Sequence, residues 1–264
     1  MDELIRSTDK RGVHTLRMNR PAVHNAFDAA LIRELTLALC AAEQDDAVKV
    51  VVITGTGACF SAGADINWMR AQADASQDDN ERDALELAAL MRTLNFLAKP
   101  SMAVVNGSAF GGGLGLIATC DISIAVDNAR FGLTEVRLGL VPAVISPYVF
   151  RRLGEANARR YFLTGERFDS ATAQALGLIQ QCVSPEQLEQ SAEEVISQLL
   201  KAGPRAMVEA KQLLFEISGQ NVDSQLAIDK QTSKLIARLR VSSEGQEGLA
   251  AFLEKRKPVW LDPQ

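Results

Sequence analysis

Apolar residues along the first half of the chain follow the pattern of strands that pack into a sheet. Residues 4–7 and 13–18 alternate or run apolar on either side of a turn at Lys10, Arg11 and Gly12, which predicts a β-hairpin. Nearly uninterrupted apolar runs, typical of strands that are covered on both faces, lie at 48–54, 102–105 and 122–126. We therefore expect a largely buried sheet.

Helical patterns separate these strands. Asp28 can cap a helix that runs to about residue 43, with its leucines on one face. The segment 71–83, rich in Asp, Gln and Ala, is expected to be solvated and mobile. A helix over 81–97 follows and ends before Pro100, because the residue before a proline is disfavoured in a helix.

The order strand, glycine-rich loop, helix occurs twice, at 48–70 and at 101–120. This repetition favours an α/β fold of stacked ββα units, with ligand-binding loops at one edge.

Beyond about residue 145 the pattern becomes helical. The expected helices cover 147–153, 156–163, 170–176, 185–200, 204–218, 223–238 and 243–254. No linker rich in Pro, Ser or Gly divides them from the preceding units. We expect a core over 1–200 that carries the site, and a helical region over 201–264 that contributes to an oligomer interface.

Charge and cysteine content narrow the range of ligands. The net charge of -5 and the pI near 5.2 mean that the overall field repels anions, so local dipoles or a few placed cations must hold any anionic ligand. Nucleic acid is not expected as a partner. The four cysteines form no CxxC pair, so we expect reduced thiols and no metal site. With no apolar run of about 20 residues and no signal-peptide pattern over 1–12, we expect no membrane association and a cytoplasmic location.

Two segments of small residues follow expected strands. Residues 59–66, CFSAGADI, allow a ligand to approach the backbone closely at 61–64. Residues 106–115, NGSAFGGGLG, place three glycines where a helix begins. A helix start without side chains presents free N–H groups and the positive end of the dipole to an oxyanion, which is the geometry that an enolate requires. The alternative for 59–66 is a tight strand-to-helix turn capped by Asp65.

A third segment carries an acidic residue. Glu135 lies in the largely apolar run 131–142, FGLTEVRLGLVP. A carboxylate drawn into such surroundings is a natural general base or acid. The alternative is an ion pair with Arg137 or Arg130 on a solvated turn, and this segment alone leaves both interpretations open.

Other chemistries fit less well. Gly113, Gly115 and Ala118 match a dinucleotide-binding GxGxxA pattern, but no clear βαβ continuation carries an acidic residue about 20 residues later. A P-loop is excluded because no Gly-Lys-Ser/Thr follows. His14 and His24 have no nucleophile pattern that ties them to a Ser or Cys, so a catalytic triad is not expected.

Together the three segments resemble the crotonase superfamily of enoyl-CoA hydratases and isomerases, over essentially the whole chain. The matching features are Arg20-Pro21, Asn25-Ala26, SAGAD at 61–65, NGSAFGGGLG at 106–115, CDI at 120–122, TEVRLGLVP at 134–142 and FLEKRKP at 252–258. The resemblance implies a crotonase-like superhelix of stacked ββα units with a C-terminal helical region. It also implies an acyl-CoA thioester substrate, no separate cofactor because CoA is part of the substrate, and a homotrimer or dimer of trimers.

The resemblance also implies roles for single residues. Ala64 and Gly112 would supply the two N–H donors of an oxyanion hole for the thioester oxygen, and Glu135 matches the second of the family's two catalytic glutamates. The positions implied to line the CoA path or to contact CoA are Ala22, Val23, Ala62, Asp65, Ile66, Phe252 and Lys255. The last two belong to a C-terminal stretch that contacts CoA from a neighbouring subunit in some members.

One position departs from the pattern of the hydratases. Their first glutamate would lie at position 115, which is Gly115 here. Two carboxylates therefore cannot hold one water in the standard way. Glu135 could act alone on the water as base and acid, it could move a proton between two carbons as in the isomerases, or the protein could bind CoA esters without turnover.

The stretch 135–148, EVRLGLVPAVISPY, favours the first outcome. It resembles bacterial methylglutaconyl-CoA hydratases of leucine breakdown and of the related acyclic terpenoid pathway, which can carry Gly where Gly115 stands. Their substrate has its own carboxylate, which could order water or pair with an arginine. We therefore expect an enoyl-CoA hydratase, a carbon–oxygen lyase, that acts on 3-methylglutaconyl-CoA or a related branched glutaconyl-CoA.

Overall fold

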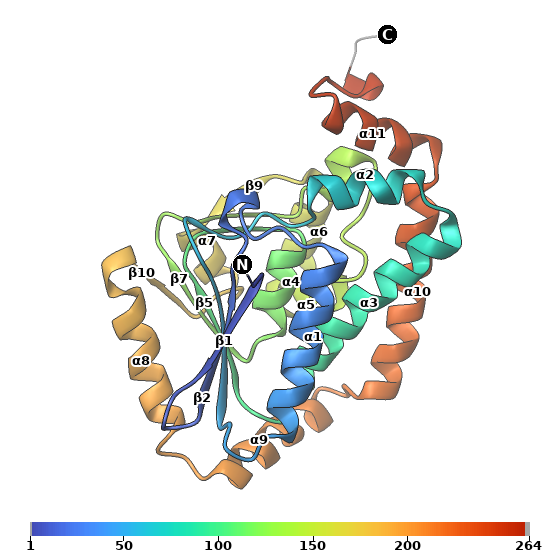
Figure 1. The fold of residues 1–264 in the computed structure, drawn as a ribbon. Helices are drawn as coiled ribbons and strands as arrows, with labels where there is room; N and C mark the ends of the chain where they lie inside the picture. Colours follow the sequence, from blue (N-terminus) through green and yellow to red (C-terminus); the bar gives the residue numbers. More distant parts are fainter. Residues whose placement is uncertain (1, 262–264) are drawn as a thin grey trace.

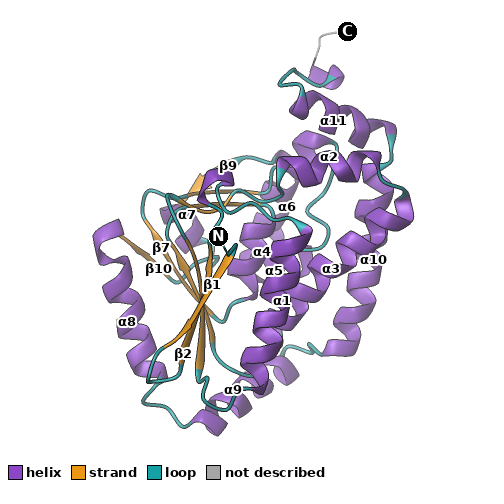
Figure 2. Cartoon of the chain, in the orientation of Figure 1, coloured by secondary structure: helices purple, strands orange, loops and turns teal. Residues whose placement is uncertain are grey.

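The computed structural model describes residues 2–261 and arranges them around a six-stranded sheet (Figures 1 and 2). The strands, in spatial order, are β1 (Leu4–Thr8), β2 (Val13–Met18), β3 (Val50–Gly55), β5 (Ser101–Val105), β7 (Ile122–Val126) and β10 (Gln181–Val183). β1 and β2 form the expected antiparallel hairpin, and the other neighbours run parallel. The apolar runs thus predict five strands of this sheet, whereas β10 is too short to show a pattern.

A second sheet follows the carboxyl ends of the first. β4 (Cys59–Ser61), β6 (Ser108–Phe110) and β8 (Arg130–Gly132) are parallel neighbours, and β9 (Arg167–Asp169) pairs antiparallel with β8. Each strand has three residues, which is too few for a periodic pattern to reveal. The sequence therefore did not predict this sheet.

The two sheets explain how distant segments converge. β3 leads directly into β4, β5 into β6 and β7 into β8, and a helix or helical turn follows each pair, so the ββα unit occurs three times instead of the two expected. Because β4, β6 and β8 are parallel neighbours, their carboxyl ends lie at the same edge. The loops that follow them, at 62–65, 111–112 and 133–135, are brought together there.

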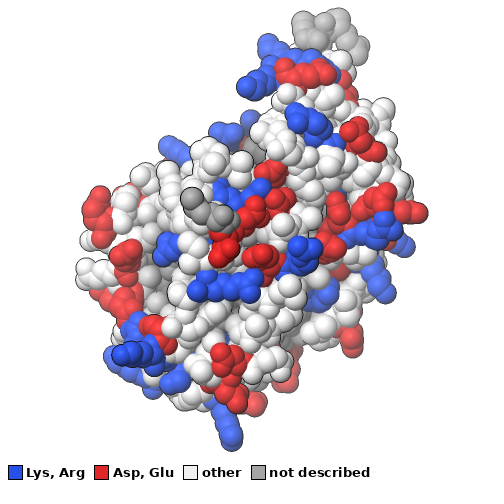
Figure 3. All heavy atoms as spheres, viewed as in Figure 1, with Lys and Arg blue, Asp and Glu red and all other residues white. Residues whose placement is uncertain are grey.

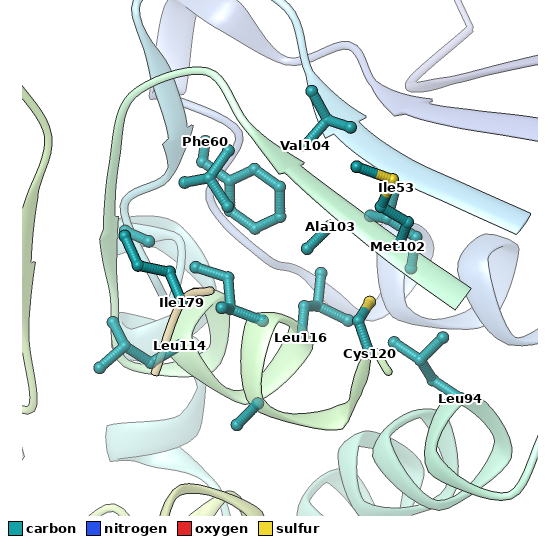
Figure 4. Close-up of a cluster of buried hydrophobic side chains, with 14 of the residues drawn as sticks. Ile53, Phe60, Leu94, Met102, Ala103, Val104, Leu114, Leu116, Cys120 and Ile179 are labelled. Carbon is teal, nitrogen blue, oxygen red and sulfur yellow. The ribbon is translucent and has the colours of Figure 1, made fainter. Parts of the chain in front are cut away.

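Helices cover both faces of the six-stranded sheet. α8 (Leu188–Leu199) lies on one side, and α1 (Ala29–Gln44), α3 (Gln77–Asn95) and α4 (Gly112–Thr119) lie on the other (Figure 1). Every residue of α4 after Gly112 is buried, and Leu116 and Cys120 point toward Met102 and Ala103 of β5 (Figure 4). This all-round burial holds the first residue of α4 in place at the edge of the second sheet.

The segment 71–83 is largely solvated as expected, since most of its residues are exposed or half-buried, but it is also mostly helical: it holds the end of α2 and the start of α3. α3 begins at Gln77, and Ser76 caps it by accepting a hydrogen bond from a backbone N–H of the first turn. Gln72 and Asn80 are buried, and the Asn80 side chain donates to the Gln72 carbonyl at 2.9 Å. The polar side chains of this segment are therefore partly engaged inside the protein.

The remaining helices lie where the pattern predicts them, within a few residues. They are α2 (Ile66–Asp74), α5 (Ser146–Leu153), α6 (Glu155–Thr164), α7 (Ser170–Ala175), α9 (Pro204–Ile217), α10 (Val222–Arg240) and α11 (Ser243–Leu253). The 3-10 turn η3 (Pro185–Gln187) begins the expected helix over 185–200, whereas η1 (Pro21–Val23), η2 (Glu135–Leu138) and η4 (Val259–Leu261) were not predicted. α10 packs along α3, where Arg92 pairs with Asp229, and α11 packs on α2 and η2 (Figure 1). α10 and α11 thus pack against helices and a turn that follow the second sheet, whereas α9 lies at the other end of the molecule (Figure 1).

The expected boundary at residue 200 falls between α8 and α9 and stays a prediction. Residues 1 and 262–264 of the two predicted regions lie outside the described residues.

The described surface mixes charges of both signs. Figure 3 shows Lys and Arg interspersed with Asp and Glu over the visible face, as is typical of a solvated surface. Among residues 2–261 no helix has the length and apolarity to span a membrane, and no three His, Cys, Asp or Glu side chains gather as metal ligands. The four cysteines are free thiols.

Candidate functional site

A cavity of about 720 Å³ lies where the three loops meet at the edge of the second sheet. This volume lies within the range of small-molecule sites, and all three loops line it. Ala64, Gly112 and Glu135 border it, as do six of the seven positions implied to meet CoA: Ala22, Val23, Ala62, Asp65, Ile66 and Phe252. Lys255 does not border it and lies exposed after α11.

Ala64 presents its N–H to the cavity because of a local strand-like pairing. Phe27 donates to the carbonyl of Gly63 at 2.7 Å, and Asp65 donates to the carbonyl of Phe27 at 2.8 Å. In such a parallel bridge the residue between the two bonds directs its own N–H to the opposite side. Within residues 2–261 the Ala64 N–H donates no hydrogen bond, so it remains available to a ligand.

Gly112 presents its N–H because it begins α4. Gly111 has φ 48° and ψ −120°, a backbone conformation that only glycine adopts readily. The Gly111 carbonyl accepts from Leu114 at 2.9 Å and from Gly115 at 3.3 Å, whereas the Gly112 N–H has no acceptor within the described chain. It is one of the unsatisfied donors that every helix start carries, here at the positive end of the dipole.

The two loops touch each other through glycine. A Cβ added to Gly63, which has φ 90°, would lie 3.1 Å from the carbonyl oxygen of Phe110 and 3.8 Å from Cα of Gly111. Gly63 and Gly111 therefore lie against each other, and the two N–H groups belong to the residues that directly follow them, Ala64 and Gly112. Small residues at 61–64 and 111–113 are needed for this approach.

Glu135 directs its carboxylate at the same place. A Cβ added to Gly111 would lie 3.1 Å from Oε1 of Glu135, so a larger residue there would crowd the carboxylate. Oε2 is buried and has no hydrogen-bond partner among the described residues. Arg130 pairs instead with Asp169, and no arginine acts on the Glu135 carboxylate among the described residues. The ion-pair alternative for Glu135 was therefore wrong.

Burial sets the proton affinity of Glu135. Loss of solvation raises its pKa to about 7, and only a hydrogen bond from its own backbone N–H opposes the shift. A carboxyl group with this pKa is close to half-protonated at neutral pH, so it can take up a proton in one step and return it in the next.

Position 115 has no space for a side chain. A Cβ added to Gly115 would lie 2.4 Å from Cγ2 of Ile145 and 3.0 Å from Sδ of Met91. Apolar side chains thus fill the space into which a carboxylate from position 115 would project. Gly113 is also required by close packing of α4, because its added Cβ would lie 3.0 Å from the Cβ of Ser61. The GxGxxA pattern that begins at Gly113 and Gly115 is therefore explained by packing.

Asp65, the second carboxylate that borders the cavity, is already engaged. It accepts from the N–H groups of Asn67 at 2.8 Å and Trp68 at 3.3 Å as the cap of α2, and it pairs with Arg20 at 3.2 Å. The tight capped turn expected as an alternative therefore exists, and it holds the Ala64 loop in place. Among described residues, Glu135 is the uncommitted carboxylate of the cavity.

The sequence did not reveal the wall that the C-terminal helices supply. Leu87 of α3, Ile236 and Arg240 of α10 and Leu249 of α11 line the cavity. The spacing of the apolar residues Leu87, Ile236 and Leu249 predicts only that one face of each helix is buried. It does not show whether that face packs on protein or lines a cavity. No signal in the sequence singled out Arg240, because a basic residue near the end of a helix is common.

Comparisons with known proteins show the family of the chain. Residues 8–263 match the family model described as enoyl-CoA hydratase/isomerase. The chain is 36% identical to the 2,3-dehydroadipyl-CoA hydratase of Escherichia coli strain K12, covering 98% of each chain. It is 33% identical to the crotonyl-CoA hydratase of Syntrophomonas wolfei, covering 93% of each. An enoyl-CoA hydratase structure from Shewanella pealeana is 44% identical, with a TM-score of 0.80 over 98% of this chain and 96% of that one. The chain therefore belongs to the enoyl-CoA hydratase/isomerase family.

Proposed function

We propose that the chain is an enoyl-CoA hydratase that adds water across the double bond of 3-methylglutaconyl-CoA or a related branched glutaconyl-CoA. The observation that carries the proposal is one uncommitted, buried carboxylate beside two free backbone N–H groups in a single cavity. Membership of the family supports hydratase activity, because the relatives compared above are hydratases by name.

In the proposed mechanism the thioester oxygen lies between the N–H groups of Ala64 and Gly112. Glu135 removes a proton from water, whose oxygen adds at Cβ, and the electron pair of the double bond moves toward the thioester. The enolate oxygen then carries negative charge against the two amides. Glu135 returns the proton to Cα, so that water is added overall and the enzyme regains its starting state.

A substrate with its own carboxylate fits the single-base arrangement. Glu135 has no second glutamate to help it orient the water, because Ile145 and Met91 fill the space beside Gly115. A carboxylate on the substrate supplies a group that can order the water or anchor the acyl chain. CoA belongs to the substrate, so the proposed reaction needs no separate cofactor.

The isomerase alternative also needs only one base, which Glu135 would satisfy. Product identity separates the two. Purified protein is supplied with 3-methylglutaconyl-CoA and, separately, with a 3-enoyl-CoA, and the products are identified by mass spectrometry. A gain of 18 Da with the first substrate is the mass of one added water and supports the hydratase. Movement of a double bond without a mass change supports the isomerase, and binding without turnover supports a non-catalytic protein.

The rate of hydration is expected to depend on pH near neutrality. Glu135 must be ionised to accept a proton from water, and its pKa is raised to about 7. kcat/KM should therefore be constant above this pH and fall about tenfold per pH unit below it. Initial rates between pH 5.5 and 9 measure this, and a flat profile across the range would contradict the role of Glu135.

We propose a homotrimer or a dimer of trimers. α9 has no buried residue, and it exposes Leu213, Leu214 and Ile217, which is unusual for apolar side chains of a single subunit. At the other end of the molecule (Figure 1), Phe252 of α11, which borders the cavity, and Trp260 of η4 are also exposed. Sedimentation equilibrium should give three or six times the chain mass of 28.6 kDa, and a monomer at micromolar concentration would contradict the proposal.

The cytoplasmic location stays a prediction.

A further inference from the structure

Arg240 is a cation inside the cavity that the proposed reaction does not use. It is the last residue of α10, where basic side chains are common because they interact favourably with the helix dipole. Arg238 already fulfils this role at the surface, since its side chain is exposed. Arg240 is turned inward instead, one helical turn after Ile236, and both residues line the cavity.

The surroundings of Arg240 leave most of its charge uncompensated. Its Nη1 donates to Oδ1 of Asn80 at 3.2 Å, and it forms no ion pair among the described residues. Asp83 acts on it only from a distance and engages Gln72 at 3.5 Å. Loss of solvation lowers the pKa of Arg240 to about 10, so the guanidinium remains protonated at neutral pH. A guanidinium removed from water in this way is costly unless a ligand pairs with it.

Arg240 lines the same cavity as Glu135, from the C-terminal end of α10, whereas Glu135 begins η2. Leu140 links the two regions: its N–H donates to the Glu135 carbonyl at 3.0 Å, and its side chain packs at Gly245, just beyond the end of α10. The walls beside Arg240 are apolar and come from Leu87, Ile236 and Leu249. The positions implied for CoA, such as Ala22 and Ala62, come from η1 and β4 on other elements.

We propose that Arg240 binds the terminal carboxylate of the acyl group and so selects CoA esters of dicarboxylic acids over uncharged acyl-CoAs. The planar guanidinium matches a carboxylate with two parallel hydrogen bonds. One relative, the 2,3-dehydroadipyl-CoA hydratase, acts by its name on a dicarboxylic acyl-CoA. The inference rests on the proposed function for the reaction, but binding alone tests it.

The phosphates of CoA are a different source of negative charge, and other residues suit them better. Arg137 and Arg167 also border the cavity, and both are exposed to solvent. Arg240 is less exposed, and its backbone is fixed because its carbonyl accepts a hydrogen bond from Gln246 Nε2 at 2.7 Å. The same Nε2 donates to the carbonyl of Ala73 at 2.9 Å. A ligand that pairs with the part-buried Arg240 must therefore lie within the cavity.

The test compares two unreactive ligands by isothermal titration calorimetry. Glutaryl-CoA carries a terminal carboxylate, and pentanoyl-CoA has the same chain length with a methyl group in its place. The wild-type protein should bind glutaryl-CoA about 10- to 100-fold more tightly. Arg240→Met should bring this ratio close to one and leave the affinity for pentanoyl-CoA within about threefold, because the carboxylate contact alone is lost. Arg240→Lys should keep part of the preference, since the charge remains without the planar pair of donors.

Asp83→Asn is the matched control. It removes the acidic neighbour of Arg240 and should keep the preference at or above the wild-type ratio. An equal loss of preference in Arg240→Met and Asp83→Asn would assign Arg240 to a structural pair and overturn the proposal. A wild-type ratio near one, or an unchanged ratio in Arg240→Met, would also overturn it, even if the protein hydrates enoyl-CoAs. A clear glutaryl preference without turnover of any enoyl-CoA would support the role of Arg240 and contradict the hydratase.

Discussion

Glu135→Gln is expected to lower kcat/KM for hydration by about 10³-fold. Gln keeps the shape of the side chain but cannot accept a proton from water at any working pH, and general acid–base catalysis contributes about 10²- to 10⁴-fold in rate. Glu135 is proposed to transfer the proton in both steps, and no second uncommitted carboxylate borders the cavity among the described residues. The rate is followed by loss of absorbance of the conjugated thioester.

Unfolding cannot account for this loss of activity. The pKa of Glu135 is about 7 in the folded protein and near 4.5 without burial, so burial favours the protonated form. The contribution of protonated Glu135 to the free energy of unfolding is therefore fully present below about pH 4.5 and is lost as the pH rises through 7. Because Gln carries no charge at any pH, the Glu135→Gln variant should be at least as stable as the wild type at pH 8. Glu155→Gln, at an exposed glutamate of α6, is the control and should keep the wild-type rate. A Glu135→Gln variant with wild-type rates would show that another group moves the proton.

Gly112→Ala is expected to reduce kcat/KM by about 10²-fold and to lower stability by about 1–3 kcal/mol. The new Cβ would lie 2.7 Å from two ring carbons of Phe27, which is fully buried and cannot retreat. The start of α4 must therefore shift, and its N–H moves away from the point where the thioester oxygen is proposed to lie. Steady-state kinetics and urea unfolding measure the two effects.

Gly203→Ala separates the local effect from the general cost of replacing glycine. Gly203 has an ordinary φ of −67°, and its added Cβ would meet only Ala206 Cβ at 3.7 Å, an ordinary contact. This control should change stability by about 0.5 kcal/mol or less and leave the rate unchanged. Equal rates in Gly112→Ala and the wild type would contradict the proposed position of the thioester oxygen.

The sequence predicted the elements that are determined by residues close together along the chain. Long apolar runs gave the strands of the main sheet, and Asp28 caps α1 as expected, by accepting from the Leu31 N–H at 2.9 Å. Three successive glycines indicated an exposed helix start at 111–113. Glu135 was a candidate because a single carboxylate stood in an apolar run, which alone left an ion pair equally open, and the buried, unpaired Oε2 favours the candidate.

Features that depend on distant contacts could not be predicted. The three-residue strands of the second sheet exist because they pair with one another, not because of their own propensity. The composition of 71–83 predicts its exposed side chains, but it does not reveal that Asn80 bonds the Gln72 carbonyl inside the protein. Arg240 lines the cavity only because α10 packs along α3, which no local pattern encodes.

The most direct test of the proposed site is a crystal structure of the protein with acetoacetyl-CoA, whose enolate form resembles the charged intermediate. The proposal predicts that the thioester oxygen lies about 2.7–3.1 Å from the backbone nitrogens of both Ala64 and Gly112, with the Glu135 carboxylate facing Cα and Cβ. A thioester oxygen that contacts neither nitrogen, or an acyl group bound outside the cavity that Glu135 lines, would contradict it.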